Sequence, residues 1–408
     1  MPVKKAARTY NVVLYGATGF VGQQTVAYFA SHPQVKALGL KWAVAGRSQD
    51  KLKAVLRKYA APQAGVVVAD AQDVEALDAL ARNASVVLST AGPFALYGSE
   101  LVAACVRHGT HYVDITGETP WVRGLIERHH AQAAKDGTRI IPFCGFDSVP
   151  SDLGTWLAQK AFLERFGEGC VSVKGAFSVR GGFNGGTMAS MFNMFASGQA
   201  STVSNPYLLN PADAPGPDAS AAADPVGPRF DVDFNAWLAP FMMGPINTRV
   251  VRRSAALLGY APTFQYQEYM RMGKGPGAAV AAGMLSGGSL LTQTAMAWSP
   301  VRKLAQRMAP QPGEGPSEEA MDGGSFRYEW IATGAKGQQV RGRVADKGDP
   351  GNRATTKMLC ESALALAVQA DELPGAGKLG GVLTPASGLG EVLVKRLQLA
   401  GMTLEIDD

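Results

Sequence analysis

The stretch LYGATGFVGQQT, residues 14–25, places three glycines in a G-x-x-G-x-x-G array directly after an apolar run. That run, residues 11–15, is typical of a short β-strand, and apolar residues recur at helical spacing after the second glycine. The helical positions are Phe20, Val21, Val26, Ala27 and Phe29. Strand, glycine turn and helix in this order predict a dinucleotide-binding unit, with a pyrophosphate at the helix N-terminus.

Each of the three glycines has a separate role in such a unit. Gly16 permits the tight turn, Gly19 lets the backbone approach the pyrophosphate, and Gly22 lets the helix pack closely on the strand. The alternative is a merely structural turn, since spaced glycines also occur by chance in turn-rich loops. The position after the first strand of an alternating α/β pattern favours the cofactor loop.

The second predicted strand distinguishes between the two nicotinamide cofactors. Residues 41–46 run into Arg47 and Ser48, so Arg47 stands where an acidic residue would bind the ribose of NAD. An arginine there suits the 2′-phosphate of NADP, through bidentate charge-assisted hydrogen bonds. NADP is therefore favoured, and the alternative is that Arg47 is a solvated residue at a helix start.

The composition is that of an ordinary globular protein. The 408 residues allow two or three domains, and 46% apolar residues are ample for hydrophobic cores. There are 39 Lys and Arg against 34 Asp and Glu, a net charge of +5 without a dense basic run, so nucleic acid is not an expected partner. Cys105, Cys144, Cys170 and Cys360 show neither disulfide nor zinc spacing, and no signal-peptide core precedes the first strand. A cytoplasmic location is expected.

Short apolar runs alternate with helix-like stretches through the first 150 residues. Further runs lie at 66–69, 85–89, 110–115 and 139–143, separated by helical stretches at 73–81, 98–108 and 120–136. Six strands alternating with helices predict a doubly wound parallel sheet of the Rossmann type. We therefore expect residues 1–150 to form an NAD(P)-binding domain.

The pattern changes after residue 150. Longer strand-like runs at 171–180, 264–270, 325–333 and 339–345 lack the βαβ rhythm and predict a mixed or antiparallel second sheet. We expect an α+β domain over 151–408 for substrate binding and dimerisation, with helices after residue 350 that can pack back on the first domain. Those helices are expected at 352–370 and 385–400, and a strand at 402–406.

Two segments have the composition of loops. Residues 204–230 are rich in Pro, Ala, Gly and Asp, and indicate a long exposed loop or a mobile lid. Residues 310–324 form a second such segment.

Residues 275–301 contain no charged residue, although basic residues flank them on both sides. The flanking residues are Arg271, Lys274, Arg302, Lys303 and Arg307. A helix would align Val280, Met284, Leu291 and Trp298 in one apolar stripe. The segment is too rich in Gly, Ser and Thr for a membrane span. We expect helices buried between domains or subunits; the alternative is an interfacial lipid-binding segment that gives peripheral membrane association.

Ligands of open parallel sheets bind at the carboxyl ends of the strands, near the point where the strand order reverses. Three predicted loops qualify. The fourth strand ends in STAGPF, 89–94, whose small residues allow backbone contact with the nicotinamide half of a dinucleotide. The fifth ends in DITGE, 114–118, and the sixth in CGFDSVPSD, 144–152.

Tyr97 and Asp147 are the candidate catalytic residues. Tyr97 follows the Gly-Pro turn and is placed to donate a proton to a substrate, although an aromatic side chain at a helix start is more often a packing residue. Asp147 lies in the sixth loop. Asp147 and Ser151 also suit helix N-caps, and Glu118 suits a helix start, where the dipole favours a negative charge.

Several other mechanisms are disfavoured. None of the eleven tyrosines is followed by lysine four residues later, so the Tyr/Lys relay of short-chain dehydrogenases is missing, as is a G-x-S-x-G nucleophile elbow. The histidines lack metal-ligand partners, so no metal is expected. Cys144 is expected to be a small buried hydrophobe rather than a nucleophile.

Six motifs are spread over most of the chain. They are YGATGFVG at 15–22, AGR at 45–47, STAGPFALYGSELVAACVRHGTHYVDITGE at 89–118, GFDSVPSDLG at 145–154, PGEGPSEE at 312–319 and GGVLTPASGLGEVLVKRL at 380–397. Together they resemble the saccharopine dehydrogenase-like oxidoreductases, and especially their trans-acting enoyl reductase branch. The run at 89–118 is much more specific than the glycine loop.

The resemblance implies an NAD(P)-binding Rossmann domain, a second α/β domain with a mixed sheet, and reduction of a carbonyl, an imine or an activated double bond. In the enoyl reductase members, the substrates are long lipid intermediates. The residues that the resemblance assigns to the adenosine and pyrophosphate end are Gly16, Thr18, Gly19, Phe20, Val21, Arg47 and Ser48, and those near the nicotinamide are Ala91, Gly92 and Pro93. Gly22, from the glycine pattern, completes the set of expected cofactor-loop residues.

The leading hypothesis is an NADPH-dependent reductase of an apolar, lipid-like small molecule bound between the two domains, with a homodimer left open. One alternative is a saccharopine-type amino-acid oxidoreductase. No clear constellation of arginines is dedicated to substrate carboxylates, although Arg180, Arg249, Arg252 and Arg253 keep that alternative open. The other alternative is a non-catalytic NADP sensor.

Overall fold

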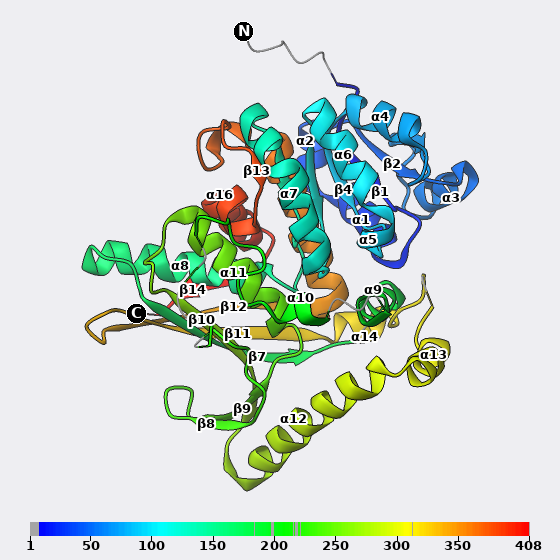
Figure 1. The fold of residues 1–408 in the computed structure, drawn as a ribbon. Helices are drawn as coiled ribbons and strands as arrows, with labels where there is room; N and C mark the ends of the chain where they lie inside the picture. Colours follow the sequence, from blue (N-terminus) through cyan, green and yellow to red (C-terminus); the bar gives the residue numbers. More distant parts are fainter. Residues whose placement is uncertain are drawn as a thin grey trace.

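The computed structural model describes residues 8–182, 184–196, 200–214, 216, 219–220, 222–311 and 313–407. The predicted segments 204–230 and 310–324, and the motif at 312–319, lie partly outside these residues. Figure 1 shows two sheets, the first in the upper part of the molecule with its helices and the second across the lower half.

The first sheet contains seven parallel strands among the described residues, in the order β13-β6-β5-β4-β1-β2-β3. The strands are β1 (Tyr10–Tyr15), β2 (Trp42–Gly46), β3 (Gly65–Val68), β4 (Ala84–Ser89), β5 (His111–Asp114), β6 (Arg139–Ile141) and β13 (Gly381–Val382). The order reverses between β1 and β4, so the carboxyl ends of these strands flank the crevice where dinucleotides bind. The six predicted strands are present; β13 was not predicted, because two residues are too short for an apolar pattern.

Helices cover both faces of the first sheet, which explains why its strands are continuous apolar runs. The helices that follow its strands are α1 (Phe20–Ser31), α2 (Pro33–Ala37), α3 (Gln49–Lys58), α4 (Val74–Asn83), α5 (Phe94–Tyr97), α6 (Ser99–His108) and α7 (Thr119–Asp136).

The second sheet is mixed, as predicted, with the order β14-β12-β11-β7-β10-β9-β8 among the described residues. Its strands are β7 (Ser172–Arg180), β8 (Arg229–Asp231), β9 (Ala236–Pro240), β10 (Gln265–Gly273), β11 (Ser325–Thr333), β12 (Gln339–Lys347) and β14 (Thr403–Ile406). Only β7 and β10 pair in parallel, and the other neighbours are antiparallel.

The remaining helices follow β6 in the chain. They are α8 (Val149–Phe166), α9 (Gly185–Ala196), α10 (Ala200–Ser204), α11 (Gly244–Leu258), α12 (Gly275–Ala297), α13 (Ser299–Met308), α14 (Glu318–Asp322), η1 (Pro350–Ala354), α15 (Thr355–Val368), η2 (Ala370–Glu372) and α16 (Pro385–Leu399). α8 packs on β11 and β12, while α15 packs on α1, β1, β4 and β5. One buried cluster includes Val12 of the first sheet and Trp330 of the second. The domain division at residue 150 stays a prediction.

The segment 204–230 is anchored at its beginning, near residues 205–209, whereas Val226 and Phe230 further along are exposed, as expected. Arg249 donates hydrogen bonds to the carbonyl oxygens of Val203 and Asn205, at 2.9 and 3.2 Å. Leu208 and Leu209 are buried. The interpretation as an exposed loop or mobile lid is therefore wrong at these positions, because buried arginines bind the backbone of the segment.

α12 also departs from the leading expectation for 275–301. The helix packs on β9 and β10, but it lies along the lower edge of the molecule, away from the first sheet (Figure 1). The apolar stripe is exposed, with exposed fractions of 63% at Val280, 73% at Met284, 72% at Leu291 and 65% at Trp298. A helix buried between the domains is therefore the wrong interpretation. No helix among the described residues is long and apolar enough to cross a membrane.

Candidate functional site

The glycine loop joins β1 to α1 at the carboxyl edge of the first sheet. Gly16 has a φ of +84°, and a Cβ on it would lie 2.9 Å from the backbone nitrogen of Ala91. A Cβ on Gly22 would lie 2.1 Å from the carbonyl oxygen of Gly16. The fold therefore requires glycine at both positions, because a side chain would collide with neighbouring backbone.

Gly19 differs, because the packing of the protein does not require a glycine there. A Cβ on Gly19 would meet only the carbonyl oxygen of Gly16, at 3.4 Å, within the described part of the chain. Gly19 is the N-cap residue of α1, which has no side-chain cap and no acidic residue in its first turn. The N-terminal N–H groups and the positive end of the helix dipole remain available, so the loop fits a pyrophosphate.

The rest of the predicted loop belongs to the same turn. The carbonyl oxygen of Thr18 accepts a hydrogen bond from Gln23 Nε2 at 3.3 Å, and Val21 is buried. The ring of Phe20 lies against Gly315, on which a Cβ would come within 2.5 Å of that ring. A segment from the second half of the chain therefore reaches the cofactor loop.

Arg47 follows β2 and is exposed, with no ion-pair partner among the described residues. Burial raises the pKa of Tyr15 to about 12, aided by Asp70, and the Arg47 charge opposes this shift from close by. Ser48 is the N-cap of α3, and its hydroxyl accepts a hydrogen bond from the N–H of Lys51 at 3.4 Å. The Arg47 guanidinium is thus available for a 2′-phosphate, while Ser48 has a capping role of its own.

The loop after β4 lies beside the glycine loop. The N–H of Thr90 donates a hydrogen bond to the carbonyl oxygen of Tyr15 at 2.9 Å. The Thr90 hydroxyl donates a second one to the carbonyl oxygen of Gly16 at 3.2 Å. These bonds bring Ala91 and Gly92 to the crevice between β1 and β4. The Gly92–Pro93 peptide bond is cis.

Glu118 caps α5, which follows the Pro93 turn, rather than its own helix. Its buried carboxylate accepts hydrogen bonds from the N–H groups of Phe94 and Ala95, at 2.8 and 3.0 Å. Ser190 of α9 donates to the same carboxylate at 2.9 Å, and its Oγ would lie 3.5 Å from a Cβ on Gly92. α9 therefore lies against the loop predicted to hold the nicotinamide. Glu118 lies at a helix start, as expected, since it is the N-cap residue of α7, but its carboxylate binds the start of α5 instead of its own helix.

Asp147 is a half-buried residue in the loop after β6, and its carboxyl group is desolvated. It forms no hydrogen bond among the described residues, and its Oδ2 lies 3.7 Å from the position of a Cβ on Gly117. Burial raises its pKa to about 7, because a desolvated carboxylate is disfavoured. The N-cap of α8 is Ser148, and Ser151 donates to Glu268 at 2.7 Å, so the capping interpretation of Asp147 and Ser151 is wrong.

Tyr97 and Cys144 differ in accessibility. Tyr97 ends α5 with an exposed fraction of 41% and, within the described ranges, has no hydrogen bond to Asp147. Cys144 is fully buried, and burial raises the pKa of its thiol, which leaves it the small hydrophobe that was predicted. Over the part of the chain that is described, no group of three or more His, Cys, Asp or Glu could hold a metal ion.

Three of the four arginines considered for binding substrate carboxylates bind other groups of the protein instead. Arg249 pairs with Asp224 at 2.6 Å, and Arg252 donates to the carbonyl oxygens of Ala222 and Tyr266 at 2.9 and 3.0 Å. Arg253 donates to the carbonyl oxygens of Leu209 and Val382. All three side chains are buried. These contacts leave the three arginines committed to backbone and Asp224, so they are not free to bind a polyanionic substrate.

The sequence patterns do not reveal a buried cluster that holds α9. Asn184 Nδ2 donates to Asn352 Oδ1 at 2.8 Å, and Asn352 Nδ2 donates to Asp349 Oδ1 at 2.6 Å. The other Asp349 oxygen accepts the N–H of Gly182 at 2.6 Å. The cluster joins the start of α9 to η1. Its one signal in the sequence is the turn GDPGN, 348–352, between a strand and a helix.

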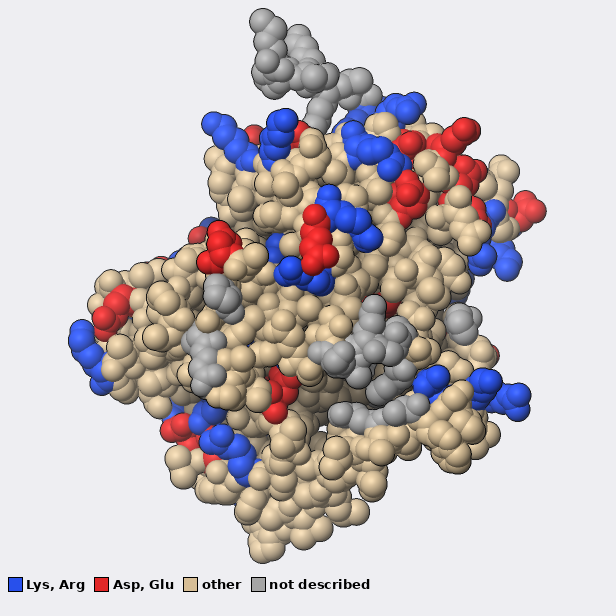
Figure 2. Space-filling model, in the orientation of Figure 1, with Lys and Arg blue, Asp and Glu red and all other residues tan. Residues whose placement is uncertain are grey.

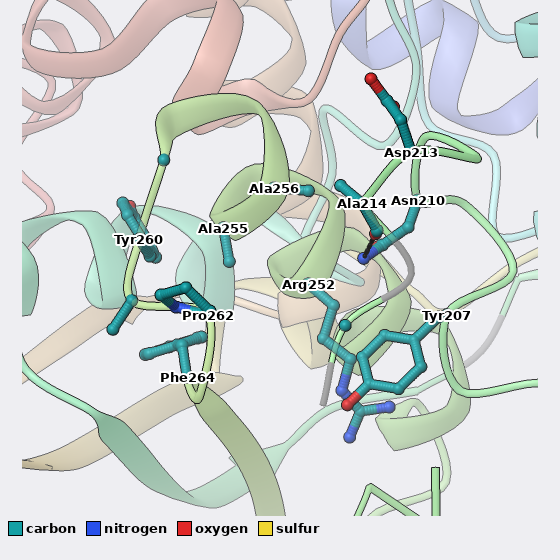
Figure 3. Close-up of a pocket in the computed structure, with 13 residues that line it drawn as sticks. Tyr207, Asn210, Asp213, Ala214, Arg252, Ala255, Ala256, Tyr260, Pro262 and Phe264 are labelled. Carbon is teal, nitrogen blue, oxygen red and sulfur yellow. Dashed lines mark hydrogen bonds between the residues drawn. The ribbon is translucent and has the colours of Figure 1, made fainter. Parts of the chain in front are cut away.

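A hollow of about 370 Å³ lies elsewhere. Its lining comes from two segments and one helix: Tyr207, Asn210, Asp213, Ala214 and Gly216 from the first segment, Gly259, Tyr260, Ala261, Pro262 and Phe264 from the second, and Arg252, Ala255 and Ala256 from α11. Figure 3 shows Arg252 and Tyr207 together on one side of it and Phe264 across from them. None of the predicted cofactor or catalytic residues lines this hollow, so it is separate from the crevice between β1 and β4.

Comparison with known proteins identifies relatives along the whole chain. Residues 12–141 match the family described as saccharopine dehydrogenase NADP binding domain. The chain is 38% identical to a putative trans-acting enoyl reductase of Mycobacterium tuberculosis, over 98% of this chain and 97% of the relative. It is 36% identical to a trans-acting enoyl reductase of Mycobacterium ulcerans, over 98% of this chain and 99% of that one.

A solved structure shares the fold. Apo saccharopine dehydrogenase (L-Glu forming) from Saccharomyces cerevisiae aligns with a TM-score of 0.52 at 13% identity, over 98% of this chain and 99% of that one. This likeness confirms the predicted architecture of a Rossmann sheet with a second mixed sheet. The match of residues 12–141 confirms the predicted NADP-binding domain. Because the sequence identity to these relatives extends over nearly the full length, the chain belongs to the saccharopine dehydrogenase-like oxidoreductases, in their trans-acting enoyl reductase branch.

Proposed function

We propose that this protein is an NADPH-dependent reductase that saturates the double bond of an enoyl group on a lipid-like substrate. The observation that carries the proposal is the convergence of three features at one edge of the first sheet. The first is the glycine loop, at which α1 begins without a side-chain cap. The second is Arg47, which has no ion-pair partner among the described residues, and the third is the pair of loops that carry Pro93 and Asp147. The names of the relatives point to the same reaction class.

The cofactor residues divide between its two ends. The backbone at Gly16, Thr18, Gly19, Phe20 and Val21 would bind the pyrophosphate, and Gly22 would let α1 pack close to this loop. Arg47 would bind the 2′-phosphate, and Ser48 caps α3. Ala91, Gly92 and Pro93 would lie against the nicotinamide, since the β4 loop is bonded to the β1 loop. Bound NADPH would supply the hydride.

Asp147 is the proposed proton donor. Reduction of an enoyl group adds a hydride to one carbon and a proton to the other, so the protein must provide a proton near the nicotinamide. Asp147 has a pKa near 7 and is not tied to another side chain in the described chain, so it is partly protonated at neutral pH. Tyr97 is the second candidate, because its helix follows Pro93.

The surroundings of Asp147 favour an apolar substrate. The apolar side chain of Ile246 lies near its carboxyl group, since a Cβ on Gly117 would be 2.9 Å from Ile246 Cδ1 and 3.7 Å from Asp147 Oδ2. The commitment of Arg249, Arg252 and Arg253 to the fold weighs against the saccharopine-type amino-acid alternative. We also propose that such a substrate arrives from the side of the molecule on which α12 is exposed.

Consumption of NADPH with a long-chain 2-enoyl thioester tests the proposal. We expect one saturated thioester, identified by mass spectrometry, for each NADPH consumed. Gly19→Asp should abolish turnover and NADPH binding, because a carboxylate would occupy the pyrophosphate position. Gly227→Asp is the matched control, since a Cβ there meets nothing within 4 Å.

The alternatives give different results in the same assay. Turnover of a small keto acid and an amino acid, without turnover of the thioester, would identify an amino-acid oxidoreductase. NADPH binding without turnover of either substrate would identify a sensor. Arg47→Ala should lower affinity for NADPH at least ~10-fold and leave that for NADH unchanged, which corresponds to about 1.4 kcal/mol.

A further inference from the structure

A surface helix normally buries its large apolar side chains and exposes polar ones, and α12 does the reverse. Among the residues of α12 whose burial is described, the buried side chains are the small ones of Ala282 and Ser286, on a helix that packs against β9 and β10. Its large apolar side chains face outward, and none of its residues is charged. In water, burial of the large side chains would stabilise the helix more, since the free energy gained scales with the apolar area removed from water. The outward face is therefore suited to a surface other than water.

The exposed apolar residues form a continuous surface. Val280, Met284, Leu291 and Trp298 share one face, because their spacings of 4, 7 and 7 residues return to nearly the same helix angle. The surface continues on α13, where Leu304 is 58% and Met308 80% exposed. Contiguous exposed apolar patches rimmed by polar groups mark interaction sites.

The charged residues of the segment that carries this apolar surface, 274–313, are all cations. Lys274, Lys303 and Arg307 have no ion-pair partner among the described residues, and the sequence has no Asp or Glu between 274 and 313. Figure 2 shows the lower edge of the molecule as uncharged, with blue side chains on the side where Figure 1 places α13. The charge of this surface is complementary to an anionic partner.

We propose that α12 and α13 form a docking surface for an anionic lipid bilayer. An apolar helix face with Lys and Arg beside it is the pattern of an interfacial helix, which lies in the plane of the headgroups. A symmetric contact with a second copy fits less well, because it would bring two sets of cations together without any carboxylate between them.

The docking surface is connected to the crevice. α13 packs on α9, whose Ser190 bonds to Glu118 beside the Pro93 loop. Beyond α13, the N–H of Gly185 donates to the carbonyl oxygen of Glu314 at 2.9 Å, and Gly315 lies on Phe20 of the cofactor loop. Delivery of a lipid-like substrate from the bilayer to the crevice rests on the proposed function, whereas bilayer binding itself does not.

Co-sedimentation of the full-length protein with vesicles tests the docking surface. We expect binding to phosphatidylcholine vesicles that contain phosphatidylglycerol to be at least ~10-fold stronger than to phosphatidylcholine alone, and to weaken with salt. Met284→Ser/Leu291→Ser/Trp298→Ser and, separately, Lys303→Glu/Arg307→Glu should each lower binding at least ~10-fold. NADPH affinity should not change in either variant.

Matched controls change equally exposed residues elsewhere. Leu38→Ser/Leu163→Ser/Leu399→Ser alters three apolar side chains that are 56%, 57% and 89% exposed, and Lys36→Glu/Lys41→Glu alters two surface charges on the first unit. The controls should bind vesicles as the native protein does.

Three results would overturn docking: no vesicle binding, equal losses in the controls, or a solution dimer that the α12 variant dissociates. Vesicle binding without enoyl reduction would refute the proposed function alone, and enoyl reduction without vesicle binding would refute docking alone.

Discussion

At the scale of single residues, the three glycines of the first loop differ in what makes glycine necessary. Gly16 and Gly22 are required by the neighbouring backbone, whereas Gly19 has space beside it. The fold itself therefore requires glycine at two positions of the motif. At the third, Gly19, a side chain would be excluded only by a bound ligand. This difference separates the cofactor interpretation from that of a merely structural turn.

Gly22→Ala should destabilise the fold, whereas Gly19→Ala should not do so strongly. The Gly22 Cβ would lie 2.1 Å from the carbonyl oxygen of Gly16, so α1 must move away from the loop, at a cost of about 1–3 kcal/mol. Gly19→Ala should cost less than about 1 kcal/mol, as the loss of a glycine N-cap does. Urea unfolding measures both, and native-like stability of Gly22→Ala would show that the loop can adjust.

Asp147 should make the reaction pH-dependent near neutrality. Because burial raises its pKa to about 7, the carboxyl group is protonated below that pH and loses its proton above it. As a proton donor it is active only when protonated, so kcat should fall as the pH rises through about 7. The free energy of unfolding should change in the same direction. The contribution of Asp147 to stability is greatest below the pKa of the unfolded chain and is lost as the pH rises through the pKa of the folded protein.

Asp147→Asn should lower kcat at least ~100-fold, remove the decline above neutral pH and leave NADPH binding unchanged. Asp50→Asn, at an exposed position of α3, is the control. An unchanged pH profile in Asp147→Asn would exclude Asp147 as the donor.

At the scale of elements, short-range and long-range capping have different origins. Ser48 caps the helix that directly follows it in the chain. Glu118 instead caps α5, which precedes it by 24 residues, at its bond to Phe94. The first contact depends on local chain geometry, and the second depends on how β4 and β5 lie side by side.

Glu118→Gln should weaken the turn that carries Pro93. An amide has one acceptor oxygen, so one of the N–H groups of Phe94 and Ala95 would lose its partner inside the protein. The expected cost is about 1–3 kcal/mol in stability, with weaker NADPH binding. Glu127→Gln, which changes an exposed i,i+4 pair on α7, should cost less than about 0.5 kcal/mol. Similar effects of the two substitutions, by urea unfolding, would contradict the capping role.

At the scale of the whole molecule, a buried carboxylate joins α1, the helix after the glycine loop, to the C-terminal helices α15 and α16. Glu361 of α15 accepts hydrogen bonds from the hydroxyl of Tyr28 and from Nε of Arg396, at 2.5 and 2.7 Å, and lies 3.0 Å from Nε2 of His32. Burial alone would raise the pKa of Glu361, but these partners hold it below its ordinary value. The ion pair thus links α1, α15 and α16.

Arg396→Met should destabilise the protein by about 3–5 kcal/mol at neutral pH, because Glu361 would stay buried without its cation. Since the pKa of Glu361 is lowered, its contribution is present above the unfolded pKa and is lost as the pH falls through the folded one. The difference between native protein and variant should therefore shrink in acid. Adding Glu361→Gln should restore much of the loss in urea unfolding, and no recovery would indicate that Arg396 acts through packing instead.

The sequence by itself determined the Rossmann sheet, the glycine loop, the preference for NADP and the mixed character of the second sheet. These features are encoded in patterns of about ten residues, where strand and helix periodicity, turns and loop chemistry act on the local chain. The same locality explains why a cofactor role for Arg47 could be proposed from its position at the end of one strand.

Only the tertiary structure decided which residues meet across the chain. Asn184 bonds to Asn352 over 168 positions, β13 joins a sheet whose other strands all precede it, and buried arginines hold a segment that its composition marks as a loop. The outward stripe of α12 was visible in the sequence, but its direction was not. A periodic pattern identifies an apolar face, whereas the packing of the whole molecule determines whether that face meets protein or is left exposed.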